Sequence, residues 1–69
     1  MDNLVRIAEE MIQYEAEFKE GGFVYTHIKQ NKSDPLDAIK SAVDRMTDLY
    51  DLDHQQVGQV SEIILYRLV

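Results

Sequence analysis

Apolar residues between residues 35 and 50 recur at alternating steps of three and four. The members of this stripe are Leu36, Ile39, Val43, Met46 and Tyr50. This spacing is the period of an α-helix rather than of a strand, so it predicts an amphipathic helix over 35–50. Asp34 stands where an N-cap belongs, and Pro35 follows at the first helical position. Both residues favour a helix that begins there.

A helix is also predicted over two other stretches, of which the first shows the same period. In the first, over 3–19, the stripe consists of Leu4, Ile7, Met11, Tyr14 and Phe18. The pair Gly21-Gly22 is expected to end that helix, since glycine readily takes the left-handed C-cap conformation. The second stretch, over 54–68, follows Asp53, with Gln56 three residues on. This is the spacing of a capping box.

The segment over 23–31 has a pattern that does not distinguish clearly between a helix and a strand. Phe23, Val24 and Tyr25 favour a strand, but we find no second strand to pair with it, and an isolated strand is not stable. We therefore predict a short helix with Phe23, Val24, His27 and Ile28 on its inner side. A strand that pairs across a dimer is the alternative. Together the four segments predict a single all-α, bundle-like domain of three to four helices over residues 1–69.

The expected C-terminal helix is apolar nearly all round from Ile63 onward. A helix of this kind needs burial on every side. In a domain this small, that requires a central position or a partner chain, and we therefore expect a homodimer. The residues expected to self-associate are Ile63, Ile64, Tyr66 and Leu68. Gly58, within the same helix, is expected to mark a close helix crossing.

The formal net charge of −6 disfavours nonspecific nucleic-acid binding, which needs a basic surface. One weakly basic patch runs against this trend; its residues are Thr26, His27, Lys29, Gln30, Asn31 and Lys32. The acidic remainder would repel a duplex, so nucleic acid is not the expected partner. The chain shows no apolar run of membrane-spanning length and no signal peptide, and we expect a cytoplasmic protein.

Four aspartates fall along one face of the central segment: Asp37, Asp44, Asp48 and Asp51. The simplest interpretation is a solvated helix face. The functional interpretation adds Tyr50, because tyrosine is enriched in binding hot spots and acids steer a protein toward a basic partner. We therefore expect a non-catalytic binding module: a regulator, adaptor or inhibitor that docks on another protein.

The alternative is a DNA-binding or DNA-mimic regulator of phage or bacterial origin. In a mimic, the acidic faces would imitate the phosphates of DNA. The run Asp37-Ala38-Ile39, with Ala42 and Asp44, is similar to a short helix stretch of a phage DNA-mimic protein. That resemblance covers eight positions of common helix residues.

Catalysis and metal binding find little support in the sequence. The chain has no cysteine, its serines and threonines lack the context of an activated nucleophile, and no glycine-rich phosphate loop is present. The stretch Asp51–Glu62 places oxygen ligands at the first, third, fifth and twelfth positions of a calcium loop. Gln56, however, occupies the sixth position, where an EF-hand needs glycine. We expect no enzymatic activity, no cofactor and no metal.

The segment Arg45–Leu68 loosely resembles the small aspartyl-phosphate phosphatases of spore-forming bacteria. Their signature ends in a Ser-Gln-x-Leu-Asp run. Here Ser61 matches and Glu62 replaces the glutamine, but Leu65 stands where the essential acid should be. This departure removes the catalytic residue, so the resemblance implies no phosphatase activity for this chain.

Overall fold

The computed structural model describes residues 3–30 and 34–69, and over these ranges the chain is helical, without strands. The elements are α1 (Asn3–Tyr14), the 3₁₀ turn η1 (Ala16–Phe18), α2 (Phe23–Lys29), α3 (Pro35–Asp44), α4 (Thr47–Tyr50) and α5 (His54–Leu68). The predicted all-α fold is confirmed, and the strand alternative for 23–31 is wrong over its described part. None of the described helices combines the length and the apolar content needed to cross a bilayer.

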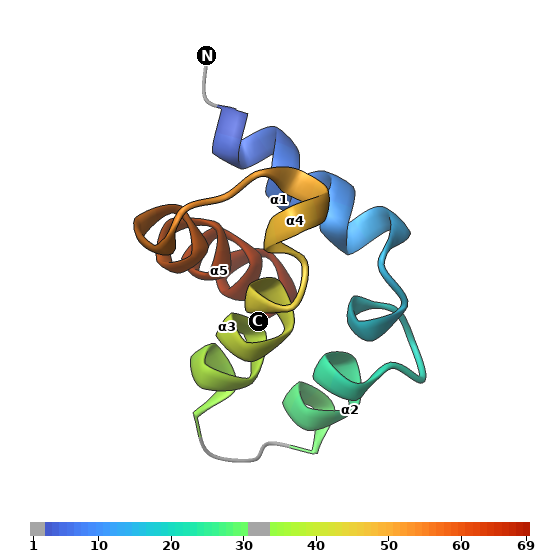
Figure 1. The fold of residues 1–69 in the computed structure, drawn as a ribbon. Helices are drawn as coiled ribbons and strands as arrows, with labels where there is room; N and C mark the ends of the chain where they lie inside the picture. The colour runs from blue at the N-terminus through green and yellow to red at the C-terminus, as the bar shows by residue number, and fades with distance from the viewer. Residues whose placement is uncertain (1–2, 31–33) are drawn as a thin grey trace.

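Helix α5 packs against both α1 and α3 (Figure 1). Helix α2 packs against α3 and η1. The core draws on every element except α4. Its buried apolar side chains are Ala8, Met11, Phe18, Val24, Ile39, Ala42, Val43, Met46, Val57, Val60 and Ile64.

The predicted bounds and cap of the last helix are confirmed. The Asp53 Oδ1 atom accepts a hydrogen bond from the Gln56 backbone N–H at 2.8 Å, and the Gln56 Oε1 atom accepts one from the Asp53 N–H at 2.9 Å. The capping box thus satisfies two donors at the helix start. The close crossing expected at Gly58 is wrong, because the nearest outside atom to a Cβ built there is the Lys40 Cε, at 4.0 Å.

The first helix ends earlier than predicted. Helix α1 stops at Tyr14 rather than near residue 19, because Glu15 takes an extended backbone conformation (φ −86°, ψ 128°) before η1 begins. The turn lets Phe18, which is 2% exposed, enter the core. Burial of this ring is a tertiary effect that overrides the local helical pattern.

The junction between η1 and α2 depends on Gly22. A Cβ built at Gly22 would lie 2.1 Å from the backbone oxygen of Ala16 and 2.6 Å from that of Glu17. No side chain can occupy that space without moving the backbone. Gly22 therefore allows the close approach of two elements, and Gly21 turns the backbone with a φ of 90°. The pair does not end a long helix as predicted.

The predicted helix over 35–50 is broken into α3 and α4. The backbone turns at Arg45 and Met46, and the Met46 N–H bonds to the Val43 carbonyl at 2.9 Å in a tighter 3₁₀-type turn. The turn brings Met46, which is 6% exposed, into the core. It also redirects α4 toward the end of α1, where Tyr50 contacts Glu15.

Two details of the sequence prediction are also corrected. Asp34 is the N-cap of α3, but its side chain makes no capping hydrogen bond; its φ is 55°, and its backbone carbonyl accepts from the Asp37 N–H at 3.1 Å. In α2, Val24 is fully buried as predicted, whereas Phe23 is 63% exposed and does not lie inside.

Candidate protein-interaction surface

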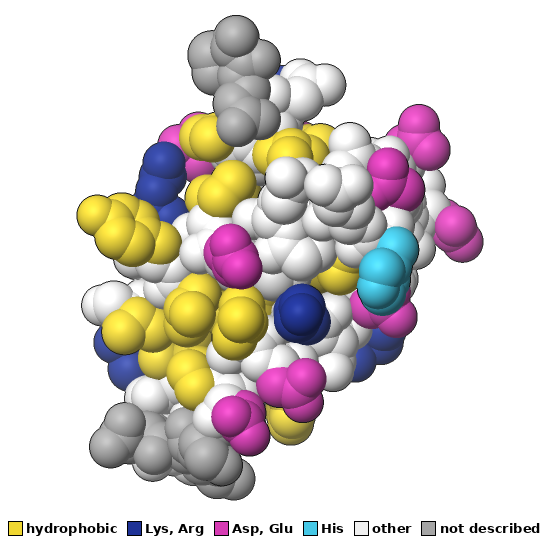
Figure 2. Space-filling model, turned by 90° about the vertical axis from the view of Figure 1, so that its left-hand side faces the viewer, with side chains coloured by type: hydrophobic (Ala, Val, Ile, Leu, Met, Phe, Trp, Pro, Cys, Tyr) yellow, Lys and Arg dark blue, Asp and Glu magenta, His cyan; other side chains and the backbone are white. Residues whose placement is uncertain are grey.

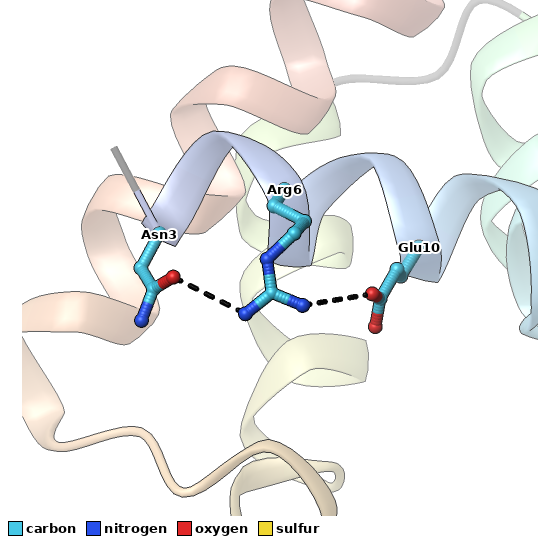
Figure 3. Close-up of polar contacts among 3 residues, drawn as sticks. All are labelled: Asn3, Arg6 and Glu10. Carbon is cyan, nitrogen blue, oxygen red and sulfur yellow. Dashed lines mark hydrogen bonds and ion pairs between the residues drawn. The ribbon is translucent and has the colours of Figure 1, made fainter. Parts of the chain in front are cut away.

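The polar face of α1 carries an arginine, Arg6, that contacts two side chains of the same helix. Arg6 Nη1 donates to Glu10 Oε2 at 3.2 Å, and Arg6 Nη2 donates to Asn3 Oδ1 at 3.1 Å (Figure 3). The three residues are spaced by three and four, so they share one face of the helix. The positive charge of Arg6 therefore compensates a glutamate on α1.

The other two arginines of the chain also pair with glutamates of α1 or η1. Arg67 Nη1 lies 2.8 Å from Glu9 Oε2 and links the last helix to the first. Arg45 Nη2 pairs with Glu17 Oε1 and links the end of α3 to η1. All three arginines are thus used on the glutamate-rich side, and the aspartates of α3 and α4 receive none of this compensation.

The four aspartates predicted to bind a partner are all exposed: Asp37, Asp44, Asp48 and Asp51. Within residues 3–30 and 34–69, none of them forms an ion pair. The structure places Asp37 and Asp44 on one face of α3, because residues seven apart lie close in angle on a helix. Asp48 lies in α4 and Asp51 is the C-cap that follows it, so the break before α4 divides the predicted face.

Open grooves flank α3 on both sides. The groove toward α2 has a volume of about 480 Å³ and is lined by Phe23, His27, Asp34, Asp37, Ala38, Ser41 and Arg45. The groove toward α5 has a volume of about 450 Å³ and is lined by Lys40, Ser41, Asp44, His54, Gln55, Val57 and Gly58. The carboxylates of Asp37 and Asp44 therefore each border a groove.

Phe23 forms an exposed aromatic wall of the groove between α2 and α3. Its ring centroid lies 6.1 Å from that of His27, with the planes tilted by 44°. Sequence reasoning missed this exposure, because the apolar spacing of α2 does not separate Phe23 from the buried Val24. An aromatic face beside the carboxylate of Asp37 suits a cationic side chain.

Tyr50 forms a hydrogen bond within the chain. Its hydroxyl donates to Glu15 Oε2 at 3.0 Å and ties α4 to the end of α1. Burial, followed by the hydrogen bond to the Glu15 carboxylate and the negative charge of that group, raises the pKa of Tyr50 to about 12 from its ordinary value of 10.0. The ring is half-buried, so Tyr50 offers less to a partner than the sequence suggests.

We expect Tyr50→Phe to change how stability depends on pH. Between pH 10 and 12 the unfolded chain loses the Tyr50 proton while the folded chain keeps it, so this group's contribution to stability falls as pH rises. Below pH 10 the contribution is constant. Urea unfolding at pH 9 and pH 11 should show a smaller loss of stability for Tyr50→Phe than for wild type. Equal losses would contradict the raised pKa of Tyr50.

The residues predicted to self-associate are divided by the fold. Ile64 is fully covered within one chain, Ile63 and Leu68 are half-buried against the core, and Tyr66 is 86% exposed. Val69 is likewise exposed. In Figure 2, hydrophobic side chains form a group toward the left of the face drawn, and most acidic side chains lie outside that group. Of the four residues, Ile64 is therefore closed to a partner, whereas Ile63, Tyr66 and Leu68 remain at least partly exposed.

The weakly basic patch is described as far as Gln30; Asn31 and Lys32 lie outside the described residues. The Lys29 Nζ atom lies 5.4 Å from the ring centroid of Tyr25, a cation–π contact that uses this charge within α2.

The calcium-loop residues are also placed by the structure. The Asp53 carboxylate caps α5, and Glu62 lies within the same helix. Among the described residues, no three histidine or acidic side chains converge as a metal site. Ser61, which matches the phosphatase signature, is buried, and its Oγ donates to the Val57 carbonyl at 2.6 Å. This hydrogen bond satisfies the buried hydroxyl within α5.

Comparison with models of known protein families, with curated proteins and with solved structures gave no match in any of the three cases.

Proposed function

We propose that this protein is a small non-catalytic binding module that docks on a basic protein partner through α3 and the adjoining grooves. The observation that supports this proposal is the separation of charge on the surface. Each arginine compensates a glutamate of α1 or η1, whereas exposed aspartates of α3 and α4 have no ion pair in the described part of the chain. Exposed carboxylates that form no ion pair attract a basic partner and raise the association rate.

The groove between α2 and α3 offers a partner a specific short-range contact in addition to the charge attraction. Phe23 offers an aromatic face, and Asp37 offers a carboxylate on the opposite wall. Arg45 also lines this groove, but its guanidinium pairs with Glu17. An arginine of the partner can stack on Phe23 and hydrogen-bond to Asp37, which combines cation–π attraction with a charge-assisted bond.

The module acts as a regulator, adaptor or inhibitor in the cytoplasm under this proposal. Its action is steric, because docking on a basic surface covers that surface. A DNA-mimic regulator is a particular form of the same mechanism, in which the covered surface is one that otherwise binds DNA.

The test is capture of the partner, followed by quantitative binding. Tagged wild-type protein is used to capture partners from an extract of the source cells, and the partner found by mass spectrometry is purified. Asp37→Asn is expected to weaken binding by about threefold to tenfold at low salt, and Phe23→Ala by a similar factor. The effect of Asp37→Asn should shrink as ionic strength rises, since exposed charges are screened, whereas that of Phe23→Ala should change less because the ring carries no charge.

Gln13→Lys is the matched control. It changes the net charge by the same single unit as Asp37→Asn, but at an exposed position on α1. If Gln13→Lys weakens binding as much as Asp37→Asn, net charge decides the affinity and the docking surface is wrong. If duplex DNA competes with this protein for the partner, the DNA-mimic form of the proposal is favoured.

A further inference from the structure

The outer side of α5 carries a short line of residues that the fold leaves open. Gln59 is exposed, Ile63 is half-buried and Tyr66 is 86% exposed. Their spacing of four and then three places them in one line along the helix, as in the contact seam of a coiled coil. This line, which we call the α5 seam, lies away from the buried residues Val57 and Ile64.

A hollow runs beside the α5 seam. It has a volume of about 450 Å³ and is lined by Leu4, Gln59, Glu62, Ile63, Tyr66 and Arg67. Leu4, from α1, forms the wall opposite the seam. A protruding ring next to a hollow is the shape that a two-fold symmetric contact needs, because each copy offers both parts to the other.

Opposite charges border the α5 seam. Glu62 lies on one edge and has no ion pair within the described ranges 3–30 and 34–69. Arg67 lies on the other edge, and its pair with Glu9 leaves its side chain 43% exposed. In two parallel helices, a residue on one edge faces the residue five positions later on the partner. Parallel pairing therefore brings Glu62 to Arg67 twice, whereas antiparallel pairing brings like charges together.

We propose that a second copy of this chain docks on the α5 seam, with the two α5 helices parallel and related by a two-fold axis. Ile63 and Tyr66 form the contact, and Glu62 of each copy pairs with Arg67 of the other. The seam is short, so the dimer forms at micromolar or higher concentration. The aspartates of α3 take no part in this contact, so the inference is independent of the proposed function.

Sedimentation velocity over a range of concentrations tests the dimer. Wild type is expected to associate, and Tyr66→Ala is expected to weaken association by about tenfold or more, because tyrosine anchors dominate small contacts. Glu62→Lys alone and Arg67→Glu alone should each remain monomeric. A mixture of these two variants should form a heterodimer, because both cross-pairs are then attractive.

Disulfide trapping tests the orientation. The chain has no cysteine, so a single introduced thiol reports one position. Gln59→Cys is expected to cross-link under mild oxidation, since parallel pairing places residue 59 opposite itself. Gln13→Cys, on α1, is the matched control and should remain monomeric. A wild type that stays monomeric at millimolar concentration would overturn the proposal. So would unchanged association of Tyr66→Ala, or cross-linking of both thiols at the same rate.

Discussion

Replacing Gly22 with alanine is expected to destabilise the domain by about 3 kcal/mol or more. Overpacking usually costs about 1–3 kcal/mol when flexible side chains can move aside. Here the added methyl group would meet the backbone oxygen of Ala16 at 2.1 Å and that of Glu17 at 2.6 Å, and neither oxygen can rotate away. A domain of this size has a total stability of roughly 3–10 kcal/mol. The substitution therefore removes a large part of that stability.

Urea unfolding followed by far-ultraviolet circular dichroism measures this effect. Gly58→Ala is the control, because the nearest outside atom to its added Cβ is the Lys40 Cε, at 4.0 Å. That change lies inside α5 and should stabilise the domain by about 1 kcal/mol, since alanine favours a helix over glycine. If Gly22→Ala unfolds at the wild-type urea concentration, the described approach of η1 to α2 is wrong.

Replacing Ile64 with alanine is expected to cost about 3 kcal/mol. Ile64 is fully buried on the inner face of α5, between α1 and α3. Removing its branched side chain loses apolar burial and leaves a cavity, and such changes cost about 2–5 kcal/mol in well-packed cores. Tyr66→Ala, two residues later, should change the stability of the single chain by less than about 0.5 kcal/mol, because Tyr66 is 86% exposed.

Thermal melts of dilute samples compare the two variants without a contribution from association. We expect a large drop in melting temperature for Ile64→Ala and almost none for Tyr66→Ala. The reverse order would mean that α5 is rotated about its axis relative to the structure described. Because Ile64 reports on folding and Tyr66 on the surface, Tyr66 is the proper probe of self-association.

Local signals in the sequence predict α5 fully and the other helices in part. The capping box that marks the start of α5 is formed by Asp53 and Gln56, which lie three residues apart. Because this signal is local in the sequence, the start of α5 could be predicted. The break after Tyr14 and the break at Met46 could not. Both place a side chain, Phe18 or Met46, in a core formed by segments distant in sequence. No local pattern contains that information.

The candidate surface was also predicted only in part, since local features could be read from the sequence and long-range contacts could not. Exposure of the aspartates follows from their spacing and was predicted. The arginine pairings were not, because Arg45 is 28 residues from Glu17 and Arg67 is 58 residues from Glu9. The separation of charge that supports the proposed function arises from these long-range contacts. It is therefore visible in the structure alone.

The packing of α5 against both α1 and α3 also constrains how the chain folds during synthesis. Helices α1 and α3 pack mainly on α5, which follows both of them in the chain. Until residues 54–68 leave the ribosome, the apolar faces of α1 and α3 have no common surface to cover. A nascent chain that lacks α5 therefore exposes those faces, and such exposed faces favour chaperone binding and aggregation. The packing of α1 and α3 into this core therefore waits until α5 has been synthesised.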